Sequence, residues 1–370
     1  MADEPNRVPQ GRVVSIDALR GFDMFWIIGG EGLVKTLIVF SGIAWLAPLT
    51  GQLEHTHWNG FTFYDLIFPL FLFIVGASMP FAISRRLQRG DDRGQIYSHI
   101  LKRFVTLLLL GFIYNGLLDF DFSHFRFTGV LHRIALCYLF AALIVMNTGV
   151  RGQAVTAAII LLAYWAIIKL VPVPGFGAGV LTPEGNLAAY LDQRFLPGAF
   201  CCYQFGDNEG ILSTVPAVAT TLMGVLSGHW LRTERGGAEK AAKLAAAGVV
   251  SLLVSLVWNL AFPINKLLWS SSYVIHSGGW SLLLLAAFYW VIDVRGWRRW
   301  TLFFVVIGLN PITIYVLQSQ FDFGLISLIF TRGFIDHLGA FRPVAESIGY
   351  LLFGWLFLYF LYRKKIFLKA

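Results

Sequence analysis

Residues 55–65 hold the side chains of this sequence that are best suited to acid–base chemistry. His55 and His57 precede the apolar run 61–83, in which Asp65 is the only charged side chain. An imidazole close to a carboxylate can act as a general base, because the carboxylate orients the ring and stabilises its protonated form. A carboxylate inside an apolar run is also costly without such a partner. The pattern predicts one catalytic histidine, His55 or His57, supported by Asp65.

The residues between these histidines and the apolar run indicate a turn at a membrane surface. Asn59-Gly60 is a turn signal, which places Trp58 at the level where aromatic side chains gather in membrane proteins generally. An aromatic ring beside a catalytic histidine is also a natural platform for a sugar ring. The turn alone leaves both interpretations of Trp58 open.

The composition excludes a soluble globular protein. Of the 370 residues, 57% are hydrophobic and only 14% are charged, and the mean hydropathy is +0.67. The first ten residues show no removable leader, so we expect the first apolar segment to remain as a membrane helix. The formal net charge of +8 is then a signal of membrane topology, and we expect no nucleic-acid partner.

Segments long enough to cross a bilayer recur along the whole chain. They predict an all-α polytopic membrane protein, a single bundle of about ten transmembrane helices. A shorter apolar piece at 323–330 is expected to be re-entrant or interfacial. The predicted spans are 14–38, 61–83, 101–118, 128–147, 153–171, 211–231, 244–262, 269–293, 301–318 and 345–362.

Basic residues gather on one side of these spans. If the N-terminus is cytosolic, the basic loops 85–103 and 232–243 fall on the cytosolic side, as the positive-inside rule requires. Both termini are then cytosolic, and His55 faces the opposite compartment. The longest loop, 172–208, lies on the side of His55 and is expected to be a partly ordered lid or rim. The predicted parts are a cytosolic tail (1–13), one transmembrane domain (14–362) and a basic cytosolic tail (363–370).

Polar side chains inside or beside the spans gather toward the side of His55. Within a bilayer such residues pair with one another or line a functional cavity. Asp65 and Arg133 are a plausible ion pair, which would make both of them structural. A water-filled binding cavity is favoured for the set as a whole. Its predicted substrate-binding members are Trp58, Asn59, Arg133, Glu209, Asn265, Lys266, His276 and Asn310.

A second group of charges lies at the opposite side. Asp17, Arg20 and Asp23 follow one face of the first helix at i, i+3 and i+6. They could simply anchor the helix at the membrane surface. Alternatively, Arg20, with Asp17 beside it and Arg103 from the basic loop, offers a site for an anionic cytosolic ligand such as a coenzyme phosphate.

The cysteines do not suggest redox or metal chemistry. Cys137 is isolated, and a bridge between the neighbours Cys201 and Cys202 would be strained, so all three are expected to be structural. No metal-ligand spacing, phosphate-cradling loop or serine-hydrolase elbow is present in the sequence. We expect no metal cofactor.

Several short motifs follow one another in order along the chain. They are Ser15-x-Asp17-x-x-Arg20-Gly21, His55-x-x-Trp58-Asn59-Gly60-x-Thr62-x-x-Asp65-Leu66-x-Phe68-Pro69, Gly129-Val-Leu-x-Arg133, Glu209-Gly-Ile-Leu, Pro263-x-Asn265-Lys266-x-Leu-Trp269 and Tyr362-Arg-Lys-Lys-Ile-Phe. With these motifs the chain resembles, from about Arg12 to Lys369, the heparan-α-glucosaminide N-acetyltransferase family of transmembrane acetyltransferases.

The resemblance implies a function and two catalytic residues. Acetyl would be taken from acetyl-CoA on the cytosolic side and placed on the amine of a glucosamine residue on the far side. The essential histidine of the family falls on His55, and its helix carboxylate falls on Asp65.

The sequence also departs from the family's lysosomal members. It lacks a counterpart of their long luminal region, and Ile27, His132 and Asn208 replace an asparagine, a glutamine and a proline. The short form resembles bacterial members associated with amino-sugar and chitin use, which implies a bacterial inner membrane and a smaller acceptor.

The sequence therefore predicts a multi-pass acetyltransferase with acetyl-CoA as co-substrate and His55 as general base. Direct transfer and an acetyl-His55 intermediate are both compatible with it. We expect an amino sugar and the lipid bilayer as partners and allow for a homodimer. The alternative is an amino-sugar permease that performs no chemistry, although no inverted repeat of the kind common in transporters is visible.

Overall fold

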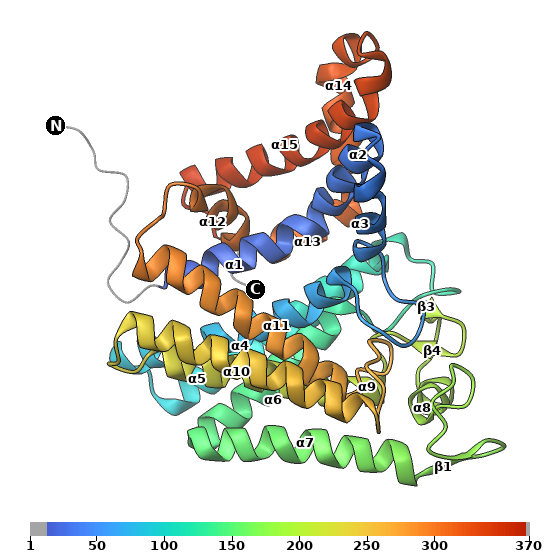
Figure 1. The fold of residues 1–370 in the computed structure, drawn as a ribbon, viewed down its shortest axis with the longest axis vertical. Coiled ribbons are helices and arrows are strands. Elements are labelled where there is room, and N and C mark those ends of the chain that lie inside the picture. The colour runs from blue at the N-terminus through green and yellow to red at the C-terminus, as the bar shows by residue number, and fades with distance from the viewer. Residues whose placement is uncertain (1–12, 368–370) are drawn as a thin grey trace.

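The computed structural model describes residues 13–367, which form a bundle of long helices with two short β-hairpins at one end (Figure 1). In this range nine helical stretches are long and apolar enough to cross a membrane. A bent pair, α12 (Thr301–Leu309) with α13 (Pro311–Gln320), would make a tenth. The predicted all-α polytopic fold with about ten spans is confirmed.

The spans alternate with short connecting elements. The first span joins α1 (Val14–Phe25), the π-helical turn η1 (Trp26–Gly30) and α2 (Glu31–Ser41). The other spans are α4 (Phe63–Gln88), α5 (Arg93–Tyr114), α6 (Val130–Asn147), α7 (Val150–Leu170), α9 (Ile211–Leu231), α10 (Gly237–Asn259), α11 (Ser271–Tyr289) with η4 (Trp290–Val294), and η5 (Gly339–Phe341) with α15 (Arg342–Arg363). The shorter helices are η2 (Ala44–Leu46), α3 (Ala47–Gln52), η3 (Leu117–Asp119), α8 (Leu187–Phe195) and α14 (Phe323–Ile335). The hairpins pair β1 (Pro172–Val173) with β2 (Gly177–Ala178), and β3 (Cys202–Tyr203) with β4 (Gly206–Asp207).

The two ends of the bundle differ in composition. One, here called the hairpin end, carries segment 42–62, α8 and both hairpins, which lie together in Figure 1. The other, here called the basic end, carries the turns from α4 to α5, from α9 to α10 and from α11 to α12, with Arg89, Arg232 and Arg295. The hairpin end is therefore rich in irregular structure, whereas these three turns at the basic end each carry an arginine.

Helices α4 and α9 are the most buried spans, and small residues bring their backbones together. A Cβ atom on Gly76 of α4 would lie 1.9 Å from the carbonyl oxygen of Thr221, and one on Gly224 of α9 would lie 1.9 Å from that of Phe73. Only glycine permits such an approach, a common device where membrane helices pack closely. The contact fixes the start of α4, with Asp65, relative to the start of α9, which follows Glu209.

Two spans are interrupted near the middle of the bundle. In η1 the helix breaks at Ile28 and Gly29, where Gly29 has a φ of 119°. Helices α12 and α13 meet at an angle of 71° across Asn310. Pro311 follows the break, as expected for a residue that lacks a backbone N–H and cannot continue a helix. Both breaks bring backbone and side chains of these spans into the centre of the protein.

Several predicted loops are more regular than expected. α4 continues to Gln88 and α5 begins at Arg93, so most of the predicted 85–103 loop is helical, and α10 likewise starts inside the predicted 232–243 loop. Hydropathy marks only the apolar part of a helix, whereas capping at Asp92 extends α5 into the charged region. The 172–208 loop contains α8 and both hairpins. Apart from Val13, the predicted tail 1–13 lies outside the described residues.

Candidate active site

His55, Asp65 and Lys266 meet at the hairpin end. Nδ1 of His55 lies 2.9 Å from Oδ1 of Asp65, and Nζ of Lys266 lies 3.4 Å from the same oxygen. Nζ of Lys266 is also 2.9 Å from Nδ1 and 3.1 Å from Nε2 of His55. The Asp65 side chain is fully buried, whereas half of the His55 side chain is exposed. The three groups form a compact unit in which a buried carboxylate holds an accessible imidazole.

The second oxygen of Asp65 fixes the segment that carries the histidine. Oδ2 accepts hydrogen bonds from the backbone N–H and hydroxyl of Thr56 at 3.3 and 2.9 Å. It also accepts from the N–H and hydroxyl of Thr62 at 3.2 and 3.1 Å, completing a capping box at the start of α4. One carboxylate therefore caps the helix, closes the turn and orients His55.

The turn between α10 and α11 positions Lys266. Asn265 is buried, and its Nδ2 donates to Oδ1 of Asn59 at 3.1 Å. The N–H of Gly60 donates to the carbonyl of Ile264 at 2.9 Å. Burial lowers the pKa of Lys266, although the charge of Asp65 opposes this shift. Asn59 and Asn265, both predicted to bind substrate, therefore tie the two turns of the site to each other.

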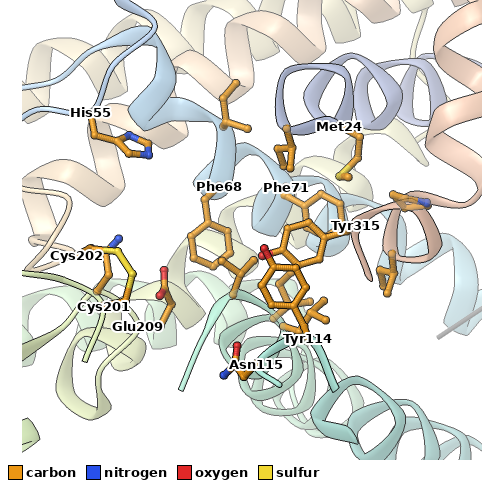
Figure 2. Close-up of a pocket in the computed structure, with 18 of the residues that line it drawn as sticks. Met24, His55, Phe68, Phe71, Tyr114, Asn115, Cys201, Cys202, Glu209 and Tyr315 are labelled. Carbon is orange, nitrogen blue, oxygen red and sulfur yellow. A yellow bond between two sulfur atoms is a disulfide. The ribbon is translucent and has the colours of Figure 1, made fainter. Parts of the chain in front are cut away.

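A cavity of about 330 Å³, the hairpin-end cavity, opens beside His55 (Figure 2). In Figure 2, His55, Cys202 and Glu209 lie toward one side of it and Met24 and Tyr315 toward the other. Tyr315 stacks on Tyr114 with ring centroids 4.6 Å apart. The lining of the hairpin-end cavity also includes Ile27, Tyr64, Phe68, Phe71, Asn115, Arg126, Asn208, Lys266, Pro311 and Ile312.

Arg126 joins two carboxylates at the wall of this cavity. Its guanidinium binds both oxygens of Asp207, at 2.7 and 2.6 Å, and also contacts Glu209. Burial raises the pKa of Asp207, but the hydrogen bonds and charge of Arg126 outweigh it and leave that pKa below its usual value. Arg126 is not among the site residues predicted from the sequence. Arg126 stands between two phenylalanines in the loop before α6, on the side of His55, and a lone arginine in such an apolar setting indicates a buried anionic partner.

Cys201 and Cys202 also border the cavity, and the structure joins them by a disulfide. This is the bridge between neighbours that the sequence indicated would be strained, and it is compatible with the predicted structural role of both cysteines. The backbone of Cys202 has a φ of 80°, and this left-handed conformation lets adjacent side chains meet. The disulfide lies beside the charged group of Arg126, because the N–H of Cys201 donates to Oδ2 of Asp207 at 3.1 Å.

A second cavity, of about 350 Å³, lies at the basic end. Arg20 lines it and is held by Asp17 at 3.1 Å and by Ser78 at 2.5 Å. Arg103, which lines it too, lies over the ring of Tyr138 with its guanidinium carbon 4.3 Å from the ring centroid. Arg85, Arg86, Arg89 and His99 complete the polar lining. The predicted cationic site at Arg20 and Arg103 is therefore a real concave surface.

The two cavities have a common wall. Phe71 of α4 and Pro311 and Ile312 at the start of α13 line both of them. These residues stand at the break between α12 and α13. The two cavities are therefore neighbours, separated by these three side chains.

Comparison with known proteins identifies the family. A model of the catalytic region of heparan-alpha-glucosaminide N-acetyltransferases matches residues 12–258, well over half of the chain. The chain belongs to the heparan-alpha-glucosaminide N-acetyltransferase family. Relatives of that name from Mus musculus and Homo sapiens are each 28% identical, over 98% and 95% of this chain and 62% and 60% of their own lengths. The chain thus spans about three fifths of the length of these relatives.

Besides Asn59 and Asn265, four predicted substrate-binding residues of this family member do not line the hairpin-end cavity. Nε1 of Trp58 donates to the carbonyl of Leu181 at 2.8 Å and so ties the histidine segment to the long loop. Nδ1 of His276 lies 2.8 Å from the hydroxyl of Ser255 between α10 and α11. Nδ2 of Asn310 donates to the carbonyl of Ile366 at 3.0 Å. Each of these three side chains connects segments of the bundle. The fourth residue is Arg133.

The proposed ion pair between Asp65 and Arg133 is wrong. Arg133 donates to the hydroxyls of Ser213 at 2.5 Å and Thr214 at 3.3 Å, and its guanidinium carbon lies 4.7 Å from the ring centroid of Trp269. It therefore points from α6 toward α9. The cation that accompanies Asp65 is Lys266, which the turn before α11 brings to the start of α4.

Proposed function

We propose that this chain is a membrane-embedded N-acetyltransferase that transfers acetyl from acetyl-CoA to the amine of a glucosamine-type sugar. One observation carries the proposal: a half-exposed histidine, held by a buried carboxylate, lies in a cavity that shares a wall with an arginine-lined cavity at the opposite end. Membership of the N-acetyltransferase family supports the same chemistry.

The basic end suits the coenzyme. Acetyl-CoA carries phosphates at one end and its thioester at the end of a long arm. Arginine binds phosphate through several directed N–H groups, and five arginines line the basic-end cavity. The apolar wall of Phe71, Pro311 and Ile312 then offers a path for the arm toward the hairpin end. Arg20, Asp17 and Arg103 remain our proposed coenzyme-binding residues.

The hairpin end suits a small acceptor. A cavity of about 330 Å³ falls at the lower end of the range for small-molecule sites, roughly 300–1,000 Å³. Glu209 and Lys266 supply polar contacts on its wall, and the ring of Tyr64 packs at a tilt of 36° against His55, with ring centroids 4.8 Å apart. We propose a single amino sugar, and not a long oligosaccharide chain, as the acceptor.

His55 is the proposed base, and Asp65 sets its tautomer. If Nδ1–H donates to Asp65, Nε2 carries the lone pair that would accept a proton from the attacking amine, and the amine would displace Nζ of Lys266, which lies 3.1 Å from Nε2. In direct transfer the amine nitrogen forms a bond to the acetyl carbon and the carbon–sulfur bond breaks. His55 takes the amine proton and returns it to the thiolate. Lys266 balances the charge of Asp65 beneath the ring.

The same proposal includes an orientation. The arginines of the basic end favour the cytosolic side of a bacterial inner membrane, with both termini there and the hairpin end outside. Whether one chain or a homodimer is the active unit does not alter the chemistry, because all of the groups named above come from one chain.

The decisive experiment uses the purified chain in lipid nanodiscs with radiolabelled acetyl-CoA and glucosamine. Labelled N-acetylglucosamine should appear with the native chain and not with His55→Ala. Coenzyme A should also raise the melting temperature of both proteins, because it binds the folded state away from His55. If no acetyl sugar forms, while proteoliposomes take up labelled N-acetylglucosamine without coenzyme A, the chain is a permease and the proposal fails.

A further inference from the structure

A third cavity, here called the lateral groove, opens on the flank of the bundle. It lies between α5 and α6 on one side and α7 and α9 on the other, and its volume is about 600 Å³. Phe140 and Val215 line it and are 48% and 44% exposed. Both residues stand within membrane-spanning helices. The groove therefore opens toward lipid.

The length of the groove matches one leaflet of a bilayer. Along α6 it extends from His132 to Ile144, about 18 Å at the helical rise per residue. One leaflet contributes about 15 Å of hydrocarbon. The part toward the basic end is apolar, whereas polar residues gather toward the hairpin end. The apolar lining includes Leu136, Phe140, Ile144, Ile160 and Val218.

The polar part of the groove contains unpaired hydrogen-bonding atoms. His132 is 6% exposed and Arg133 is 1% exposed, and both line the groove. Both ring nitrogens of His132 and Nη1 of Arg133 have no hydrogen-bond partner among residues 13–367. Leaving a buried polar atom unpaired is unfavourable, because the atom gives up its hydrogen bonds to water and gains none in return. An acyl chain alone would fill the apolar part and leave these atoms unpaired.

We propose that the lateral groove binds one phospholipid of the leaflet at the hairpin end. Its phosphate would meet His132 and Arg133, since a guanidinium N–H in apolar surroundings favours an anionic oxygen acceptor. One acyl chain would follow α6 past Leu136. Glu209 lines both the groove and the hairpin-end cavity. The lipid and the proposed acceptor site therefore share a wall, but the lipid site does not depend on the proposed reaction.

Native mass spectrometry of the purified full chain, titrated with phosphatidylglycerol, tests the site. Val215→Trp fills the groove. Val249→Trp is the matched control, because Val249 is 49% exposed on the lipid-facing side of α10. We expect one retained phospholipid for the native chain and for the control, and at least tenfold weaker binding for Val215→Trp. Equal binding by all three proteins overturns the proposal. If Val215→Trp does not fold, Phe140→Trp is the second blocking variant.

Diacylglycerol with the same acyl chains tests the role of the phosphate. The native chain should bind phosphatidylglycerol about tenfold more tightly than diacylglycerol. His132→Leu removes two unpaired nitrogens and strands no partner, so it should reduce this preference while diacylglycerol still binds. Equal affinities of the native chain for the two lipids would overturn the placement of phosphate at His132 and Arg133. A melting curve for each variant shows that it is folded.

Discussion

The two end cavities have similar volumes, about 330 and 350 Å³, but they hold charge in different ways. At the hairpin end the charged groups are paired within the protein. Asp65 is fully buried between His55 and Lys266, and Arg126 binds Asp207 through two hydrogen bonds. Such groups keep their positions without a ligand, which is what stabilising a transition state requires.

At the basic end, several cations face solvent. Arg85, on the last turn of α4, and Arg89, directly after that helix, are exposed, and the guanidinium of Arg103 lies over the ring of Tyr138. Exposed cations around a concave surface attract an anionic ligand, and this attraction weakens as the salt concentration increases. The difference implies that changes at the hairpin end act on the rate of the reaction and changes at the basic end act on binding.

The largest expected effect follows loss of the base. His55→Ala should lower turnover by about 10²–10⁴-fold, the usual contribution of a general base. The affinity for coenzyme A should not change, because His55 lies at the other end from the arginines. Acetyl transfer and coenzyme binding are measured on the same preparation.

His57→Ala is the matched control for this change, because His57 is the neighbouring histidine and is also exposed. It should retain turnover within about tenfold of the native chain. If the two variants lose the same turnover, His55 does not have a special role.

Removing the charge of Asp65 should affect both stability and turnover. Asp65→Asn leaves the buried Lys266 without its carboxylate, which should cost about 3–5 kcal/mol of unfolding free energy. Turnover should fall as well, because the tautomer of His55 is no longer set. Thermal unfolding and turnover of one purified sample separate the two effects.

A second substitution identifies the partner of Asp65. Adding Lys266→Met to Asp65→Asn should restore most of the lost stability but not the turnover. Adding Arg133→Gln should restore neither, because Arg133 binds Ser213 and Thr214. Rescue by Arg133→Gln instead of Lys266→Met would show that the charges are paired differently.

At the basic end, Arg20→Ala should weaken coenzyme A binding by about tenfold at low salt, roughly the value of one charge-assisted contact. The difference from the native chain should shrink as salt rises. Arg235→Ala is the control, because Arg235 is exposed at the same end and pairs with Glu239 at 2.6 Å. Calorimetry with coenzyme A measures both. An unchanged affinity for Arg20→Ala would assign Arg20 to anchoring α1.

Part of this molecule could be predicted from residue types and order alone. The spans follow from hydropathy, and their number is right because each apolar segment exceeds the thickness of the hydrocarbon core. His55 and Asp65 are only ten positions apart around a turn signal, so local sequence was sufficient to bring them together. The sequence also placed Arg20 and Arg103 at the same end, where they line one cavity, and the binding of a coenzyme there stays a prediction.

The contacts between distant segments were not predictable in this way. Lys266 lies 201 positions after Asp65, and nothing local distinguishes it from Arg133 as the partner of a buried carboxylate. The role of Arg126 depends on Asp207, 81 positions further on. His276 and Asn310 are polar residues within spans, but which face of a helix meets a cavity depends on the packing of the whole bundle. Periodicity shows only that such residues need a partner.

The smallest expected effect concerns Asp192 in α8, which holds the backbone of β4 and of the start of α9 at the hairpin end. It is 1% exposed and accepts hydrogen bonds from the N–H of Asp207 at 3.2 Å and of Ile211 at 2.9 Å. Burial raises the pKa of Asp192 to about 6, against the hydrogen bonds that lower it. The ordinary value is about 3.9. The folded chain therefore holds this proton more tightly than the unfolded chain, so the contribution of Asp192 to stability is fully present below about pH 4 and is lost as the pH rises through about 6.

Between pH 4.5 and 7 the melting temperature should fall by about 2–4 °C, and hydrogen exchange in residues 187–195 should speed up. Asp192→Asn should flatten this slope, whereas Glu184→Gln, an exposed acid in the same loop, should keep it. Asp207 does not account for the slope, because its lowered pKa places its titration below this range. Hydrogen exchange around Arg20 should not change over the same range. An equal response at both ends would show that the hairpin end and the basic end are not independent, and the contrast between a fixed catalytic end and an adaptable binding end would no longer hold.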